Sequence, residues 1–65
     1  MAPDPESFDA SLYMGLRFDD ARARAEADGW RVRKMVPNGT YTLEFRADRV
    51  NLLVDGDLVV DVSLG

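Results

Sequence analysis

Residues 39–54, GTYTLEFRADRVNLLV, place one isolated apolar side chain among polar ones and follow it with two arginines. Leu43 stands between a threonine and an acid, and Arg46 and Arg49 follow shortly before an apolar run. The pattern therefore indicates a segment that is offered to a protease.

The chain lacks the side chains from which most catalytic and metal sites are built. Its 65 residues include no histidine and no cysteine. Histidine is the usual general base near neutral pH and the commonest metal ligand, and cysteine supplies thiolates and disulfides. A chain of this length forms one domain at most and has little room for an enclosed active site. We expect no enzymatic activity, no metal site and no cofactor.

Charge and hydropathy limit the partners of the chain. The formal net charge is −4, and acids are interspersed among the arginines of residues 22–34. Nucleic-acid binding needs clustered positive charge, so we expect no nucleic-acid partner. No apolar run approaches the ~20 residues that span a membrane, so we expect no membrane partner. We also expect a monomer in solution. The first residues do not form a signal peptide; this predicts a cytoplasmic protein as the sequence stands, or a secreted one if a leader has been removed.

A helix is predicted over Phe18–Asp28, FDDARARAEAD. Alanine, the strongest helix former, recurs through it at every second position from residue 21 to residue 27. Asp19 and Asp20 fall in the first turn, where the helix dipole favours negative charge, and Gly29 is placed to end the helix. Arg17 occupies the cap position, where Ser, Thr or Asp would stabilise the helix more. Before the helix, residues 1–10 are predicted to be a flexible segment and residues 11–65 one domain, with residues 12–14 its first anchored part.

Three strands are predicted by the alternation of apolar and polar residues. Residues 30–36 begin with Trp30 and Val32 facing the core. Val50, Leu52 and Val54 alternate in the same way, as do Leu58, Val60, Val62 and Leu64. The Asp-Gly pair in residues 55–57 is a tight-turn signal, so the last two strands should form an antiparallel hairpin.

The stretch from Pro37 to Asp48 has two interpretations. Local rules make Pro37-Asn38-Gly39 a turn and Thr40–Phe45 a strand rich in β-branched and aromatic residues, which gives a four-stranded meander. Alternatively, the stretch is an extended, unpaired loop, and residues 49–54 form a strand parallel to residues 30–36. Loops of about twelve residues without secondary structure are uncommon and usually functional. Local rules favour the meander.

A resemblance reverses this preference. From Gly15 to Gly65 the chain resembles the potato inhibitor I family of serine protease inhibitors, which includes barley chymotrypsin inhibitor and eglin, and their small bacterial relatives. The most specific part is TLEFRADRV at residues 42–50, where family members show Thr-Met or Thr-Leu, an acid, an aromatic residue, then Arg-x-Asp-Arg-Val. The helix entry at Gly15, Pro37 near the end of the first strand, and the Gly39-Thr40 pair also match.

The resemblance implies a fold and a set of functional residues. The fold is α+β: one helix packed on a small mixed sheet, a parallel strand pair joined by a long exposed binding loop, and a C-terminal antiparallel hairpin strand. The reactive bond is Leu43–Glu44, and Arg49 supports the loop from the sheet by contacts to Thr42 and Glu44. Asn51 stands where the family often has a second supporting arginine. The bacterial relatives share an asparagine there, and Asn51 is assigned to loop support. The binding loop comprises Gly39, Thr40, Tyr41, Thr42, Leu43, Glu44, Phe45 and Arg46.

Two functions remain open at the level of sequence. The first is a reversible, substrate-like inhibitor of subtilisin-like or chymotrypsin-like serine proteases, in which the protease is the partner. The second is a non-inhibitory protein-interaction module with the same fold. A change at Leu43 separates them, because only the first needs that side chain.

Overall fold

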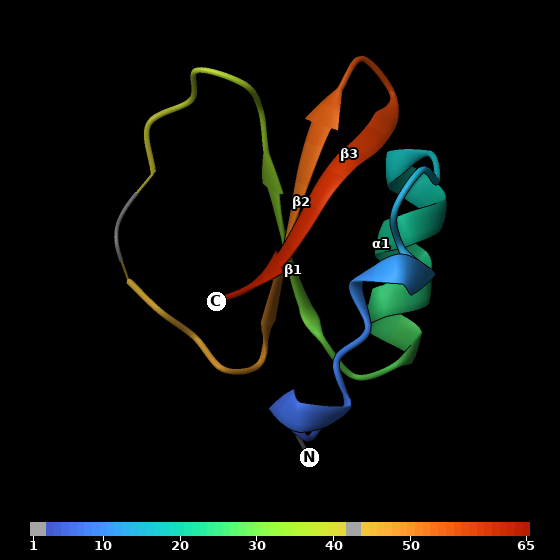
Figure 1. Cartoon of the computed structure of the whole chain (residues 1–65), viewed down its shortest axis with the longest axis vertical. Coiled ribbons are helices and arrows are strands. Elements are labelled where there is room, and N and C mark those ends of the chain that lie inside the picture. Colours follow the sequence, from blue (N-terminus) through green and yellow to red (C-terminus); the bar gives the residue numbers. More distant parts are fainter. Residues whose placement is uncertain (1–2, 42–43) are drawn as a thin grey trace.

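The computed structural model describes residues 3–41 and 44–65. In these residues, two short 3-10 helical turns, Pro5–Ser7 and Ala10–Leu12, precede helix α1, Phe18–Ala27. Strands β1, Arg31–Met35, β2, Arg49–Asp55, and β3, Leu58–Leu64, follow and form a three-stranded sheet in the order β1-β2-β3. The fold is a small α+β domain in which α1 packs on one face of this mixed sheet (Figure 1).

Helix α1 has the composition and the ends that its sequence predicts, apart from one residue. It begins at Phe18, with Asp19 and Asp20 in the first turn, and Asp28 is its C-terminal cap instead of its last residue. Gly29 follows at φ +96°, a left-handed conformation that glycine adopts without steric cost. Arg17 makes no side-chain capping bond, so the first turn lacks the acceptor that a serine or aspartate would supply.

Strands β1 and β2 are parallel, and this overturns the meander that local rules favour. Arg31 lies beside Arg49 and Met35 beside Leu53 in the register. Parallel neighbours need a long crossover connection, and the chain from Val36 to Asp48 supplies it. In its described residues 36–41 and 44–48 this connection contains no strand, so Thr40, Tyr41, Glu44 and Phe45 are not part of a fourth one. Figure 1 shows the connection on the opposite side of the sheet from α1.

Strands β2 and β3 form the predicted antiparallel hairpin, with Gly56 at φ +65° in the turn. One prediction for β3 is wrong: Leu58 and Val60 do not face the core and are about half exposed. The register shifts between Leu53, which pairs with Asp61, and Val54, which pairs with Val59. This bulge leaves Val60 without a partner on β2 and turns Val59 inward, so the alternation is interrupted in the middle of the strand.

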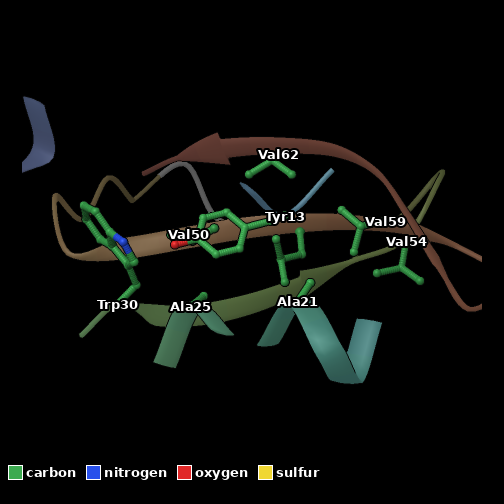
Figure 2. Packing of buried hydrophobic residues seen from close by; sticks show 9 residues of the cluster. Tyr13, Ala21, Ala25, Trp30, Val50, Val54, Val59 and Val62 are labelled. Atoms are coloured by element: carbon green, nitrogen blue, oxygen red, sulfur yellow. The ribbon is translucent and has the colours of Figure 1, made fainter. Parts of the chain in front are cut away.

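The core lies between α1 and the sheet. Figure 2 shows Ala21 and Ala25 pointing from the helix toward the side chains of β2 and β3. Val50, Leu52 and Val54 are buried on this face of β2, as the alternation predicts. The small alanine side chains let the helix approach the sheet closely, and the larger side chains of the strands fill the space between them.

Aromatic residues of the segment before α1 pack against the core together with Trp30. Tyr13 is buried, with its ring between the helix and the sheet (Figure 2), whereas its neighbours Leu12 and Met14 are partly exposed. Phe8 stacks on Tyr13 with 6.3 Å between ring centroids and meets Trp30 edge-on at 5.6 Å. Phe8 thus packs against the core from within residues 3–10.

No helix in the described part of the chain is long and apolar enough to cross a membrane.

The segment before α1 also covers the outer edge of β3. The N–H of Gly15 donates to the carbonyl of Val59 at 2.9 Å, and the N–H of Val59 donates to the carbonyl of Leu16 at 2.8 Å. The N–H of Phe18 donates to the carbonyl of Asp57 at 2.8 Å. These bonds fix the entry of the helix against the hairpin.

Candidate protease-binding loop

The loop leaves β1 through the predicted turn at Pro37-Asn38-Gly39. The N–H of Gly39 donates to the carbonyl of Val36 at 3.1 Å, and Asn38 has a φ of +65°, a conformation that asparagine tolerates better than most residues. Gly39 and Thr40, both assigned to the loop from sequence, are exposed, and Tyr41 is half-buried. The turn redirects the chain away from the sheet.

Arg49 lies at the start of β2 and reaches the loop from the sheet. Its Nη2 donates to the main-chain carbonyl of Glu44 at 2.7 Å, and its Nε donates to the carbonyl of Gly65 at 3.0 Å. The N–H of Gly65 in turn donates to the carbonyl of Arg49 at 2.8 Å. Bonds from an ionised donor are stronger than neutral ones, so Arg49 ties Glu44 to the end of β3.

The carboxylate of Glu44 has a different partner from its carbonyl. Arg46 Nε donates to Glu44 Oε1 at 2.8 Å. This ion pair is about half exposed on both sides, so it contributes at most about 1 kcal/mol to stability. Glu44 is therefore contacted by two arginines: Arg49 binds its main-chain carbonyl and Arg46 binds its carboxylate.

Phe45 extends the contact between the loop and Gly65. A Cβ placed on Gly65 would lie 2.9 Å from Cδ2 and 3.1 Å from Cε2 of the Phe45 ring, so the ring would have to shift to admit a side chain there. Gly65 also has a φ of +138°, where other residues are strained. The ring remains 69% exposed, so one side of it is available to a partner.

Tyr41 folds back onto the turn at the other end of the loop. Its hydroxyl accepts a bond from the N–H of Val36 at 2.6 Å. A Cβ on Gly39 would lie 2.6 Å from the Tyr41 ring and hydroxyl, so the glycine makes room for this side chain. The guanidinium of Arg33 lies over the same ring, with Cζ 5.6 Å from its centroid.

Asn51, assigned to loop support from sequence, is buried in β2 and acts within the sheet. Its Oδ1 accepts a bond from Arg33 Nε at 2.8 Å, and its Nδ2 donates to Ser63 Oγ at 3.4 Å. Among the described residues, its side-chain bonds thus go to β1 and β3. Of these two partners, Arg33 also contacts the loop, because its guanidinium lies over the Tyr41 ring.

The proposed reactive bond is only half within the described residues. Thr42 and Leu43 lie outside them, so the predicted contact of Arg49 with Thr42 and the placement of the Leu43 side chain are not described. On the other side of the bond, Glu44 is exposed. The structure thus describes the leaving-group half of the bond.

Sequence reasoning missed two residues that contact the loop, Arg33 and Gly65. Arg33 reads as a solvated residue of an alternating strand, and only the parallel register brings it beside Asn51. Gly65 follows the last apolar strand in the sequence, and a glycine opposite an aromatic residue can mark a close approach. Both contacts depend on which strands are neighbours, which the local sequence does not specify.

The described geometry is suited to presenting backbone to a partner. Tyr41 and Glu44, on the two sides of the proposed bond, are tied to Val36, just after β1, and to Arg49, at the start of β2. No group of three acids that could hold a metal ion occurs in residues 3–41 and 44–65. In comparisons with known proteins, no family model and no curated protein matches the chain.

Proposed function

We propose that this protein is a reversible, substrate-like inhibitor of serine proteases that presents Leu43–Glu44 as its reactive bond. The observation that carries the proposal is the bond from Arg49 Nη2 to the Glu44 carbonyl, beneath an exposed connection between two parallel strands. The resemblance of residues 42–50 to the potato inhibitor I family supports the same reading. The protease is the partner, and no cofactor takes part.

The chemistry of inhibition follows from attachment at both ends. The protease serine oxygen attacks the Leu43 carbonyl carbon, its proton passes through the protease base to the Glu44 nitrogen, and the Leu43–Glu44 bond breaks. Glu44 and its new amine stay in place because Arg49 holds the Glu44 carbonyl and Phe45 lies on Gly65. The amine can then attack the acyl-enzyme, restoring the peptide bond and the serine. Resealing therefore competes with release.

Preorganisation explains how such a loop could bind tightly. A free peptide loses conformational entropy when a protease orders it, whereas a loop already held in an extended form loses less. The described part of the loop is fixed by directed hydrogen bonds at Tyr41, Glu44 and Arg49. Leu43 in an apolar pocket adds about 1.5–3 kcal/mol.

Titration against subtilisin and chymotrypsin tests the proposal. We expect inhibition by the wild type and its loss in Leu43→Asp. Leu12→Asp is the matched control, because it makes the same change at a partly exposed leucine outside the loop and should inhibit like the wild type. No inhibition by the wild type at micromolar concentration, or equal inhibition by the wild type and Leu43→Asp, would overturn the proposal and favour the non-inhibitory interaction module.

Mass spectrometry during incubation with a trace of protease tests the mechanism separately. We expect a slow approach to a mixture of intact chain and a cleaved form whose new amino terminus is Glu44. Rapid and complete cleavage with loss of the fold would identify an ordinary substrate.

A further inference from the structure

The two halves of the loop are held by different side chains. Arg49 reaches the chain after the proposed reactive bond, at Glu44. The chain before the bond is contacted instead by Arg33 of β1, at the Tyr41 ring. The support on this side begins with a row of polar residues that crosses all three strands.

Asn51 is the centre of that row. The register places it beside Arg33 on β1 and beside Ser63 on β3. Asn51 is 7% exposed, and a polar side chain buried to this extent needs hydrogen-bond partners. Both ends of its amide have them: Oδ1 accepts from Arg33 Nε at 2.8 Å, and Nδ2 donates to Ser63 Oγ at 3.4 Å. The bond to Nε restricts the direction in which the Arg33 side chain can extend.

Arg33 is directed by this bond toward the Tyr41 ring. A guanidinium within about 6 Å of an aromatic face is attracted by the ring electrons, and Arg33 Cζ lies 5.6 Å from the Tyr41 centroid. The Tyr41 hydroxyl also accepts a hydrogen bond from the Val36 N–H, and the ring lies so close to Gly39 that a Cβ there would force it to shift. These contacts fix the position of Tyr41 two residues before Leu43.

We propose that Arg33, oriented by the buried Asn51, is the positioning residue for the half of the loop that precedes the reactive bond, and that it acts through Tyr41. Its consequence for inhibition depends on the proposed function, whereas its consequence for the free loop does not. Arg33 and Arg49 thus support the two sides of one bond from two adjacent parallel strands.

Hydrogen exchange at the Val36 amide, followed by NMR, measures the free loop. This amide donates to Tyr41 and belongs to a residue that is about half exposed, so its protection reports the Tyr41 contact. We expect exchange to become roughly three- to tenfold faster in Arg33→Met and in Asn51→Leu. The core amide of Leu52 should keep its protection in Arg33→Met, which shows that the fold is intact.

Three further variants give the test its controls. Arg22→Met makes the same change on α1 and should leave Val36 exchange unchanged. Asn51→Asp keeps an oxygen for Arg33 Nε and should restore wild-type exchange, which loss of packing alone would not predict. The double variant Arg33→Met/Asn51→Leu should exchange no faster than Arg33→Met alone, because both changes break one chain of contacts.

Unchanged Val36 exchange in Arg33→Met would overturn the proposal, as would additive effects in the double variant or failure of Asn51→Asp to restore protection. If Asn51→Leu does not fold, Arg33→Met and Asn51→Asp decide the question. In a protease assay, Arg33→Met should weaken inhibition by a similar factor while Arg22→Met does not. If the wild type inhibits no protease, the proposed function fails and the exchange experiment still decides the role of Arg33.

Discussion

The two faces of the sheet are covered in different ways. Helix α1 covers one face through apolar contacts, with Ala21 and Ala25 fully buried against side chains such as Leu52. The loop lies on the opposite side of the sheet (Figure 1). There Arg49 donates a hydrogen bond to the Glu44 carbonyl, and Arg33, bonded to Asn51, lies over the Tyr41 ring. Apolar contacts are non-directional and add with buried area, whereas each hydrogen bond fixes one geometry. The helix face therefore stabilises the fold, and the loop face determines the shape of the loop.

The largest expected effect comes from adjacent leucines on opposite faces of β2. Leu52→Ala should lower the free energy of unfolding by about 2–5 kcal/mol, because Leu52 is fully buried on the helix face. Leu53→Ala should cost clearly less, since Leu53 is only half-buried on the loop face. Denaturant unfolding measures both. Equal costs would contradict the division between the faces.

The next effect is a loss of stability in alkaline solution. Burial, together with the hydrogen bond to Asp28 at 2.7 Å, raises the pKa of Tyr13 from 10.0 to about 12. Above pH 10 the unfolded chain loses this proton while the folded chain keeps it, so stability is present below pH 10 and is lost as the pH rises toward 12. The loss attributable to Tyr13 should be about 2–3 kcal/mol at most.

Tyr13→Phe is the control for this prediction. It removes the titrating hydroxyl but keeps the ring in the core, so thermal unfolding between pH 9 and pH 12 should depend less steeply on pH. An identical pH dependence in wild type and variant would show that other groups cause the alkaline loss.

On the loop face, Arg49→Met should cost only about 1–2 kcal/mol of stability, because it removes two hydrogen bonds from a partly exposed guanidinium. Its effect on the loop should be larger than its effect on the fold. Limited proteolysis at Glu44 and Phe45 should accelerate while the core amide of Leu52 remains protected.

Arg46→Met, which breaks only the exposed ion pair, should change stability by about 0.5 kcal/mol or less.

The smallest effect has the opposite sign. Arg17→Ser should raise stability by about 0.5–1 kcal/mol, because serine supplies the capping acceptor that α1 lacks. Part of this gain is offset by loss of the exposed Arg17–Asp57 pair, whose charged atoms are 3.8 Å apart. The melting temperature should rise while Val36 exchange stays as in the wild type. A change in the loop would show that the two faces are coupled.

The difference between the helix face and the loop face also explains which features could be predicted from sequence. The alanine-rich helix, its end near Gly29, and the buried face of β2 follow from local composition and alternation, and the structure confirms them. The path of residues 40–41 and 44–45 does not follow, because Tyr41 is bonded to the Val36 N–H and Glu44 to Arg49 instead of to a neighbouring strand. A resemblance over residues 42–50, not local propensity, led to the parallel pairing.

Each error has a specific structural cause. The inward assignment of Leu58 and Val60 failed because a bulge inserts one residue and exchanges the faces of β3. Arg33 was missed because its role depends on the register that aligns it with Asn51. The assignment of Leu43 as the apolar residue of the reactive bond stays a prediction, since that residue lies outside those described.

The β3 bulge has a further consequence for how the molecule behaves at high concentration. An exposed, valine-rich edge strand such as LVVDVSL is a template for intermolecular pairing and fibril growth. Here the N–H and carbonyl of Val59 are already bonded to Leu16 and Gly15, the bulge interrupts the ladder at Val60, and the carboxylate of Asp61 accepts from the next N–H, that of Val62, at 2.9 Å. These bonds close part of the β3 edge to a second chain, so this strand should resist intermolecular pairing despite its apolar side chains.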